Sequence, residues 1–199
     1  MKIKRFIGGA LQSNGYVIYV REGGSCYIID PGYRHNRFLD FVKENSLSVN
    51  GVLLTHYHYD HTGAVKNICS ALGCSAYMFG DDRFRYKEAT EPLHDGQIID
   101  LDGEKIEVLS TPGHTAGGVC FYSAGNRVAF TGDTVFNVDL GRTDLESGSQ
   151  KELEESVRNV TEKWPGDVTI YPGHGDPCSM SYVRKENREY IEIINGGQK

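Results

Sequence analysis

Residues 55–61 read THYHYDH, and this short stretch decides the fold. The apolar run Gly-Val-Leu-Leu at 51–54 comes directly before it and predicts a buried β-strand. His56 and His58 alternate with tyrosines, so both imidazoles can point to the same side of an extended segment. The motif therefore indicates a strand whose end carries metal-ligand side chains.

A helix is expected to follow this strand. Asp60 and His61 open a helical pattern that runs through Ala64, Val65 and Ile68. A strand end that turns into a helix start brings four ligand side chains around one point. Imidazole nitrogens and a carboxylate suit zinc or iron better than calcium or magnesium. The alternative, a surface histidine cluster, would need neither the apolar strand nor the helix.

Length and charge narrow the classes of protein. The chain has 199 residues, which favours a single domain over residues 1–199. The formal net charge is −6 and basic residues are scattered, so no nucleic-acid partner is expected. Residues 1–7 lack the long apolar core of a signal peptide or membrane span, which favours a cytoplasmic protein with no membrane partner. The five cysteines are expected to be reduced thiols. The oligomeric state stays open.

Apolar patterning predicts alternating strands and helices. Strands are expected at 2–7, 16–20, 26–29, 51–55, 76–79, 97–101, 105–109, 119–122, 128–130 and 168–171. Helices are expected at 36–45, from the histidine motif to about residue 73, after a capping box at Ser149 and Glu152, and at 181–194. Residues 80–96 are polar and irregular, which predicts a connecting segment.

Two halves of the chain share one plan. Each has a hairpin that ends in an aspartate, then a helix, then an apolar strand that ends in a histidine. The landmarks are Asp30 and His56 in the first half and Asp133 and His174 in the second. This plan predicts two similar α/β layers that meet at a shared edge, with the ligand site between them.

Three further ligand candidates lie outside the motif. His114, Asp133 and His174 each come just after a predicted strand and beside a glycine, which lets the backbone turn sharply near a metal. The full candidate set is His56, His58, Asp60, His61, His114, Asp133 and His174. Seven ligands are too many for one tetrahedral zinc. They fit two metal ions about 3.5–4 Å apart that share a carboxylate and a water. His35 and His94 lie in polar context and are expected at the surface.

The chain resembles the metallo-β-lactamase fold superfamily. The matching segments are Asp30-Pro31-Gly32, residues 56–61, Thr111–Thr115, Thr131–Thr134 and Tyr171–Gly175, in family order. The resemblance implies an α/β fold, a four-layer αββα sandwich. It assigns the first metal to His56, His58 and His114, the second to Asp60, His61 and His174, and the bridge to Asp133. It also implies that Asp30 orients a ligand histidine by hydrogen bonding. Zinc is the expected metal, with iron or manganese as alternatives.

Details of the resemblance narrow the reaction. Asp133 stands where one group of secreted β-lactamases has cysteine, which argues against antibiotic cleavage. His58 stands where the flavodiiron oxidoreductases have glutamate, which favours hydrolysis. The segment Gly-Arg-Thr-Asp-Leu at 141–145 is similar to one in glyoxalase II-like thioesterases, closest to their short single-domain branch. This chain lacks the helical C-terminal extension that supplies basic glutathione contacts in the long form.

The predicted function is hydrolysis of an acyl thioester such as S-lactoylglutathione by a dinuclear metal centre. A metal-bridging hydroxide, oriented by Asp60 as a catalytic residue, would attack the acyl carbonyl. The expected partner is this small-molecule thioester. Arg142 could contact a substrate carboxylate, or brace its loop through a salt bridge with a residue such as Asp144. The alternatives are a mononuclear iron persulfide dioxygenase, a lactonase or other ester hydrolase, and a non-enzymatic binding domain.

Overall fold

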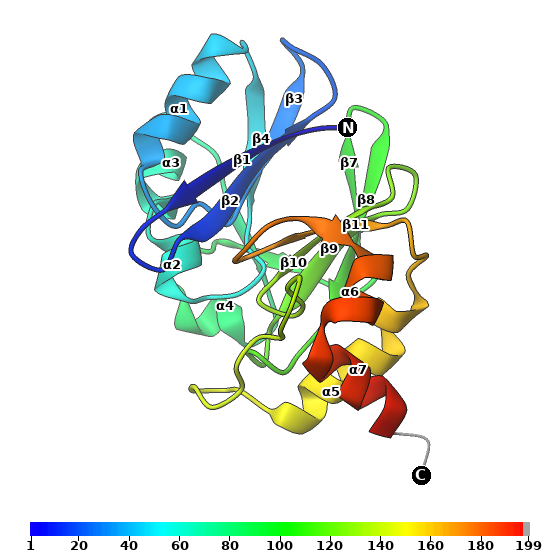
Figure 1. Cartoon of the computed structure of the whole chain (residues 1–199). Helices are drawn as coiled ribbons and strands as arrows, with labels where there is room; N and C mark the ends of the chain where they lie inside the picture. Colours follow the sequence, from blue (N-terminus) through cyan, green and yellow to red (C-terminus); the bar gives the residue numbers. More distant parts are fainter. Residues whose placement is uncertain (197–199) are drawn as a thin grey trace.

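Over the described residues, 1–196, the computed structural model contains two six-stranded β-sheets (Figure 1). The first consists of β1 (Lys2–Gly8), β2 (Ser13–Tyr19), β3 (Ser25–Ile29), β4 (Ser48–Leu53), β5 (Ala76–Phe79) and β6 (Glu91–Leu93). The second consists of β7 (Ile98–Leu101), β8 (Glu104–Ser110), β9 (Val119–Ser123), β10 (Val128–Gly132), β11 (Thr169–Pro172) and β12 (Cys178–Ser179). In each sheet the strands are neighbours in chain order.

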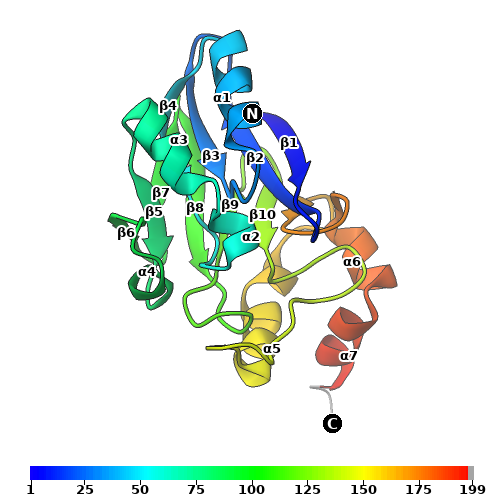
Figure 2. The ribbon, with the colours of Figure 1, turned by 90° about the vertical axis from the view of Figure 1, so that its left-hand side faces the viewer.

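Helices cover the outer faces of both sheets. They are α1 (His35–Glu44), α2 (Tyr59–Thr62), α3 (Val65–Leu72), α4 (Asp82–Arg85), α5 (Gln150–Asn159), α6 (Met180–Glu186) and α7 (Arg188–Gly196), with a 3₁₀ turn at Thr161–Lys163. Figure 2 shows α1 and α3 on one side of the strands and α6 and α7 on the other. Within residues 1–196, none of the helices is both long and apolar enough to cross a membrane.

Buried apolar side chains form three cores among the described residues, one between each pair of adjacent layers. Successive residues of a strand serve different cores, because side chains alternate between the faces of a sheet. In β3, Cys26 and Ile28 pack with α1 and α3, whereas Ile29 faces the second sheet. In β10, Phe130 faces the first sheet and Ala129 packs with α5, α6 and α7. The four-layer αββα arrangement predicted from the sequence is thus confirmed.

The two halves repeat one topology. In the first, β2 and β3 pair antiparallel with Tyr16 opposite Ile29, and β4 lies parallel to β3 after α1. In the second, β9 and β10 pair antiparallel with Phe121 opposite Phe130, and β11 lies parallel to β10 after α5. Because the ends of parallel strands β3 and β4 lie at one sheet edge, as do those of β10 and β11, each half brings its polar loops to that edge.

Residues 80–96 are more ordered than the sequence predicts. They form the one-turn helix α4 and the three-residue strand β6, which pairs with β5. Pro92 fits β6 because this strand lies at the edge of the first sheet, where its missing N–H removes no required hydrogen bond.

The C-terminal helix expected at 181–194 is two helices, α6 and α7, which meet at Asn187. Asn187 has extended backbone angles, φ −81° and ψ 104°. Its buried amide donates to the carbonyls of Phe136 and Asp139, the latter at 2.7 Å, and its Oδ1 accepts from the Tyr190 N–H at 3.0 Å. These contacts end one helix and begin the next.

Candidate metal centre

The structure brings all seven predicted ligands together. They lie in the segments that follow β4, β8, β10 and β11. The ligands after β4 come from the first sheet, and those after β8, β10 and β11 come from the second. The centre is therefore assembled between the two halves, as the repeated plan of the sequence predicts.

Three histidines form a first triad. One ring nitrogen each of His56, His58 and His114 lies within 4.8 Å of the others, and His58 Nδ1 is 2.9 Å from His114 Nε2. His114 Nδ1 donates to the carbonyl of Arg142 at 2.7 Å, so its Nε2 is free to face the triad. His56 Nε2 is buried without a hydrogen-bond partner among the described residues. Three electron-pair donors therefore converge.

Asp60, His61 and His174 form a second triad. Asp60 Oδ2 is 3.4 Å from His61 Nε2 and 3.2 Å from His174 Nε2. The two Nε2 atoms are 3.4 Å apart. His174 Nδ1 donates to the carbonyl of Leu11 at 3.1 Å, which orients the ring toward Asp60. This triad combines two nitrogens and one oxygen.

Asp133 lies between the triads. Its Oδ2 is 3.5 Å from both His114 Nε2 and His174 Nε2, so one oxygen reaches a member of each triad. Its Oδ1 is 3.4 Å from His61 Nε2, yet it is buried and has no hydrogen bond from any residue within 1–196. A carboxylate in this position can contact two cations at once.

Asp30 stands behind His61. Its carboxylate accepts from the Thr55 N–H at 2.8 Å and from the Thr55 hydroxyl at 2.5 Å. Its Oδ2 lies 3.3 Å from His61 Nδ1, on the far side of that ring from Asp60. Although Asp30 Oδ, His56 and His61 also lie within 4.8 Å of one another, Thr55 already uses this carboxylate. The contacts suit the orienting role implied by the resemblance, which stays a prediction.

The loop that carries His174 is fastened to β2. Asn14 Nδ2 donates to the carbonyls of Pro172 and Gly175 at 2.9 and 2.8 Å, and the Tyr16 hydroxyl donates to the former at 2.6 Å. Gly173 fits here because a Cβ would lie only 2.1 Å from Asp133 Oδ1. The position of His174 therefore depends on a strand from the first half of the chain.

Two histidines of the first triad, His56 and His58, are neutral near pH 7. Burial of the ring, reinforced by the charge of His61, holds the pKa of His56 well below its ordinary value. Burial and the adjacent His114 lower the pKa of His58 to about 4. Neutral imidazole is the form in which histidine binds a metal.

The carboxylates of Asp60, in the second triad, and of Asp133, beside it, are ionised. Burial would lower the pKa of His174, but hydrogen bonds with Asp133 and Asp60 raise it to about 9. Burial of His61 is likewise outweighed by the charge of Asp133, and its pKa is raised. Burial would raise the pKa of Asp60 and of Asp133, but the neighbouring histidines lower both. The carboxylates therefore draw positive charge into the site, as protons or as metal ions.

The donor set fits a metal site. Two buried atoms, His56 Nε2 and Asp133 Oδ1, point into it without a hydrogen bond, and burial of such atoms is costly unless something satisfies them. Imidazole and carboxylate donors suit zinc, iron and manganese alike.

A cavity of about 530 Å³ opens beside both triads. Its wall away from the ligands is largely apolar and consists of Leu11, Tyr59, Phe136, Leu140, Leu145 and the side of Arg142. Arg142 forms a bidentate ion pair with Asp144, with both nitrogen–oxygen distances at 2.7 Å. The bracing salt bridge that the sequence offered as an alternative is thus formed. A substrate contact by Arg142 stays a prediction.

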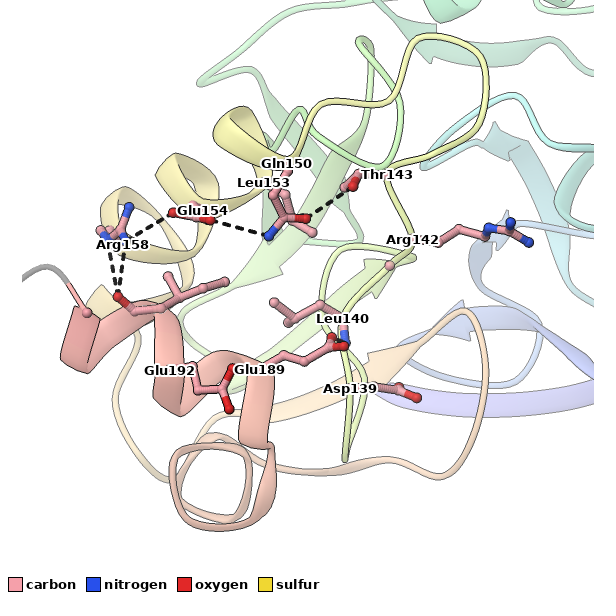
Figure 3. Close-up of a pocket in the computed structure, with 13 residues that line it drawn as sticks. Asp139, Leu140, Arg142, Thr143, Gln150, Leu153, Glu154, Arg158, Glu189 and Glu192 are labelled. Carbon is pink, nitrogen blue, oxygen red and sulfur yellow. Dashed lines mark hydrogen bonds and ion pairs between the residues drawn. The ribbon is translucent and has the colours of Figure 1, made fainter.

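A second cavity, about 610 Å³ in volume, lies between α5, α7 and the loop at 139–143 (Figure 3). Glu154, Glu189 and Glu192 make its wall acidic, and Arg158 is paired with Glu154 at 3.2 Å. None of the seven predicted ligands lines it, among the residues that the structure describes. This cavity is larger than the one beside the triads, but it is separate from the candidate metal centre.

Two histidines lie outside the centre, as the sequence predicts. His94 is exposed, and His35 is half-buried with its Nδ1 3.4 Å from Asn67 Nδ2. Neither belongs to the His/Asp groups found within the described part of the chain.

Sequence reasoning missed Asp82. It is fully buried in α4 and accepts hydrogen bonds from the loop that carries His114. It falls within 80–96, where no apolar period or ligand spacing marks it.

Comparisons with known proteins agree with this geometry. The family model described as the Metallo-beta-lactamase superfamily matches residues 8–174. An uncharacterized protein of Mycobacterium leprae is 34% identical over 215 residues, covering 94% of this chain and 97% of the relative. Hydroxyacylglutathione hydrolase GloC of Haemophilus influenzae is 30% identical over 197 residues, covering 89% of this chain and 92% of the relative.

Solved structures share the fold. The BLEG-1 B3 metallo-β-lactamase matches with a TM-score of 0.88 at 26% identity, covering 95% of this chain and 99% of that chain. The protein TTHA1623, crystallised in a di-iron-bound form, matches with a TM-score of 0.83 at 30% identity, covering 94% of this chain and 99% of that chain.

Proposed function

Because this chain belongs to the metallo-β-lactamase superfamily, we propose that it is a dinuclear metal-dependent hydrolase of acyl thioesters such as S-lactoylglutathione. One observation carries the proposal: two triads of ligand side chains face each other, and the carboxylate of Asp133 lies between them. A single tetrahedral ion would leave several of these donors unused.

The first triad would hold one ion and the second triad the other, with Asp133 in contact with both. Zinc is the proposed metal, and iron or manganese would suit the same donors; the di-iron-bound relative supports iron as the alternative. When bound, such a pair of ions would lower the pKa of a water between them and polarise an acyl carbonyl.

Asp60 is the proposed catalytic residue on the chain itself. It is half-buried, it lines the 530 Å³ cavity, and its ionised Oδ2 is held by His61 and His174. A carboxylate in this position can accept a hydrogen bond from the attacking water and so orient it toward the acyl carbon. In the loaded enzyme, the ion shared with His61 and His174 would hold Asp60 in place.

The cavity supports a small acyl thioester as the substrate. Its volume suits a small molecule, and Tyr59, Phe136 and Leu145 can contact the apolar parts of a thioester. The loop at 141–145 lines the cavity and is joined to the first triad through the bond between His114 and the Arg142 carbonyl. The GloC relative, which is named as a hydroxyacylglutathione hydrolase, supports the same substrate class.

The test is an activity panel on protein purified without added metal. Two metal ions per chain and release of free thiol from S-lactoylglutathione are expected, and both a chelator and Asp133→Ala should abolish the release. Arg188→Ala, at an exposed position at the start of α7 and outside the seven candidate ligands, serves as the control.

Other outcomes would replace the proposal. Opening of lactones without thioester cleavage would make the protein a lactonase. One iron per chain, with oxygen uptake on glutathione persulfide, would make it a persulfide dioxygenase. Full metal content without turnover of any of these substrates would indicate a binding domain.

A further inference from the structure

Asp82 carries a fully buried carboxylate that the proposed reaction does not use. It lies in the single turn of α4, between β5 and β6. A buried carboxylate is costly unless it accepts hydrogen bonds, so its partners indicate what it stabilises.

Two donors from the loop after β8 bind Asp82. The Thr115 hydroxyl donates to its Oδ2 at 2.6 Å, and the Gly117 N–H donates to its Oδ1 at 2.8 Å. Burial raises the pKa of the Asp82 carboxyl, and the nearby backbone N–H of Tyr57, in the loop after β4, acts with these two donors to lower it. Both carboxylate oxygens are therefore engaged, and the side chain lies between the loop after β4 and the loop after β8.

The groups around the Asp82 carboxylate belong to the two loops that carry the ligands of the first triad. Tyr57 stands between His56 and His58, and Thr115 directly follows His114. The second triad is supported by other groups, because His61 faces Asp30 and His174 donates to the Leu11 carbonyl. The contacts of Asp82 are thus confined to the surroundings of one triad.

Close packing reinforces this connection. A Cβ at Gly117 would lie 2.7 Å from the backbone nitrogen of Asp82 and 2.7 Å from the carbonyl oxygen of Phe79. Only glycine allows the loop to approach α4 so closely. The loop with His114 therefore rests on α4, and the carboxylate holds it there.

We propose that Asp82 is a positioning residue that sets the geometry of the first triad, and only that triad, by fixing the loops with His56, His58 and His114. The inference rests on the proposed dinuclear function. If these loops relax, the three nitrogens no longer converge, and the ion they hold binds more weakly. The second triad and its ion would be unaffected.

The test compares Asp82→Asn with Asp81→Asn, its exposed neighbour, as the matched control. Asparagine replaces one carboxylate oxygen by an NH2 group, which donates and cannot accept, so at least one buried donor loses its partner. Metal-depleted proteins are titrated with Co²⁺, and the visible absorption of each triad is identified from His56→Ala and His174→Ala. Asp82→Asn should weaken Co²⁺ binding at the first triad by about tenfold or more, in the range known for residues that support ligands. Affinity at the second triad should stay within a factor of two of wild type.

A second readout separates positioning from folding. With S-lactoylglutathione, kcat of Asp82→Asn should fall at low metal concentration and recover at saturating Co²⁺, with KM little changed. Equal loss of affinity at both triads, or wild-type affinity at the first, would overturn the proposal. Thr115→Val removes one donor and keeps the carboxylate, so it gives the same selective test if Asp82→Asn does not fold.

Failure of the proposed function would look different. It would appear already in wild-type protein, as absent thioester turnover, whereas failure of the positioning role would appear as identical Co²⁺ affinities in the Asp82 and Asp81 variants.

Discussion

Thr55 sets the proton positions at the centre. It has one hydroxyl proton, which it donates to Asp30, so its oxygen can only accept from His56 Nδ1, 3.0 Å away. The proton of His56 is then on Nδ1, and Nε2 presents its electron pair to the site. The Thr55 hydroxyl therefore connects Asp30, which faces His61 of the second triad, with His56 of the first triad.

Removing this hydroxyl should affect both stability and metal binding. Thr55→Val leaves buried groups of Asp30 and His56 without a partner, which costs about 1–3 kcal/mol of unfolding free energy. Metal affinity should fall by roughly 10–100-fold because His56 loses its orienting contact. Urea denaturation of metal-free protein and a metal titration measure the two effects. Thr90→Val, at an exposed position, is the control; if both variants behave alike, the hydroxyl has no orienting role.

Metal uptake should release protons. In the metal-free protein Asp133 and Asp60 raise the pKa of His174 to about 9, so its ring is protonated at pH 7. A metal binds only the neutral ring, so this proton must leave, and apparent affinity should increase as pH rises toward 9. Calorimetric titration at pH 7 in buffers of different ionisation enthalpy counts the protons. His174→Ala should release fewer, and an equal count in both proteins would contradict this assignment.

At the scale of elements, strands and helices with a clear apolar run were predictable from the sequence, whereas α4 and β6 were not. The apolar runs of β3, β4 and β10 identify these strands because each feeds two cores, one on each face. The one-turn helix α4 and the strand β6 are too short for any period to appear. Asp82 was missed because it lies in this single turn. It accepts hydrogen bonds from a hydroxyl and a backbone N–H, and contacts of this kind produce no recognisable residue spacing in the sequence. The seven candidate ligands could be named from the sequence because histidines and aspartates beside glycine at strand ends form a pattern of residue types.

The break between α6 and α7 was missed for a different reason. Met180, Val183, Tyr190 and Ile193 keep a helical period straight through the junction, and all four are buried in the outer core. Only contacts made by Asn187 with Phe136 and Asp139, distant in sequence, fix the break. Tertiary contacts of this kind override the local period.

Asn187→Ala should therefore be strongly destabilising. It removes the cap of α7 and leaves two part-buried carbonyls without their donor, which together cost about 2 kcal/mol. Urea denaturation monitored by circular dichroism measures the change, with the exposed Asn195→Ala as the control. A difference between the two variants below about 0.5 kcal/mol would show that the junction forms without these bonds.

For the whole molecule, the metal centre joins the two sheets. One half provides His56, His58, Asp60 and His61, and the other provides His114, Asp133 and His174. Bound ions would therefore crosslink layers that also meet through apolar packing and through hydrogen bonds such as those of Asn14, Tyr16 and Asp82.

Metal removal should lower the melting temperature. Ligand present at 100 times its Kd stabilises a folded protein by about 2.7 kcal/mol. For a chain of this size, that corresponds to a shift of roughly 5–10 °C. Scanning calorimetry with and without chelator measures it. The same chelator should shift Asp133→Ala much less, and an equal shift in both proteins would place the bound metal elsewhere.

The attachment of the His174 loop to β2 has a consequence for biosynthesis. During synthesis β2 leaves the ribosome early. The loop with His174, the last of the seven candidate ligands along the chain, follows much later. Until that segment arrives and is caught by Asn14 and Tyr16, a nascent chain can gather six of the side chains but cannot complete the second triad. Under the proposed function, loading with a full complement of ions would therefore be a late event in folding, and the chain would stay inactive until its two halves have closed on each other.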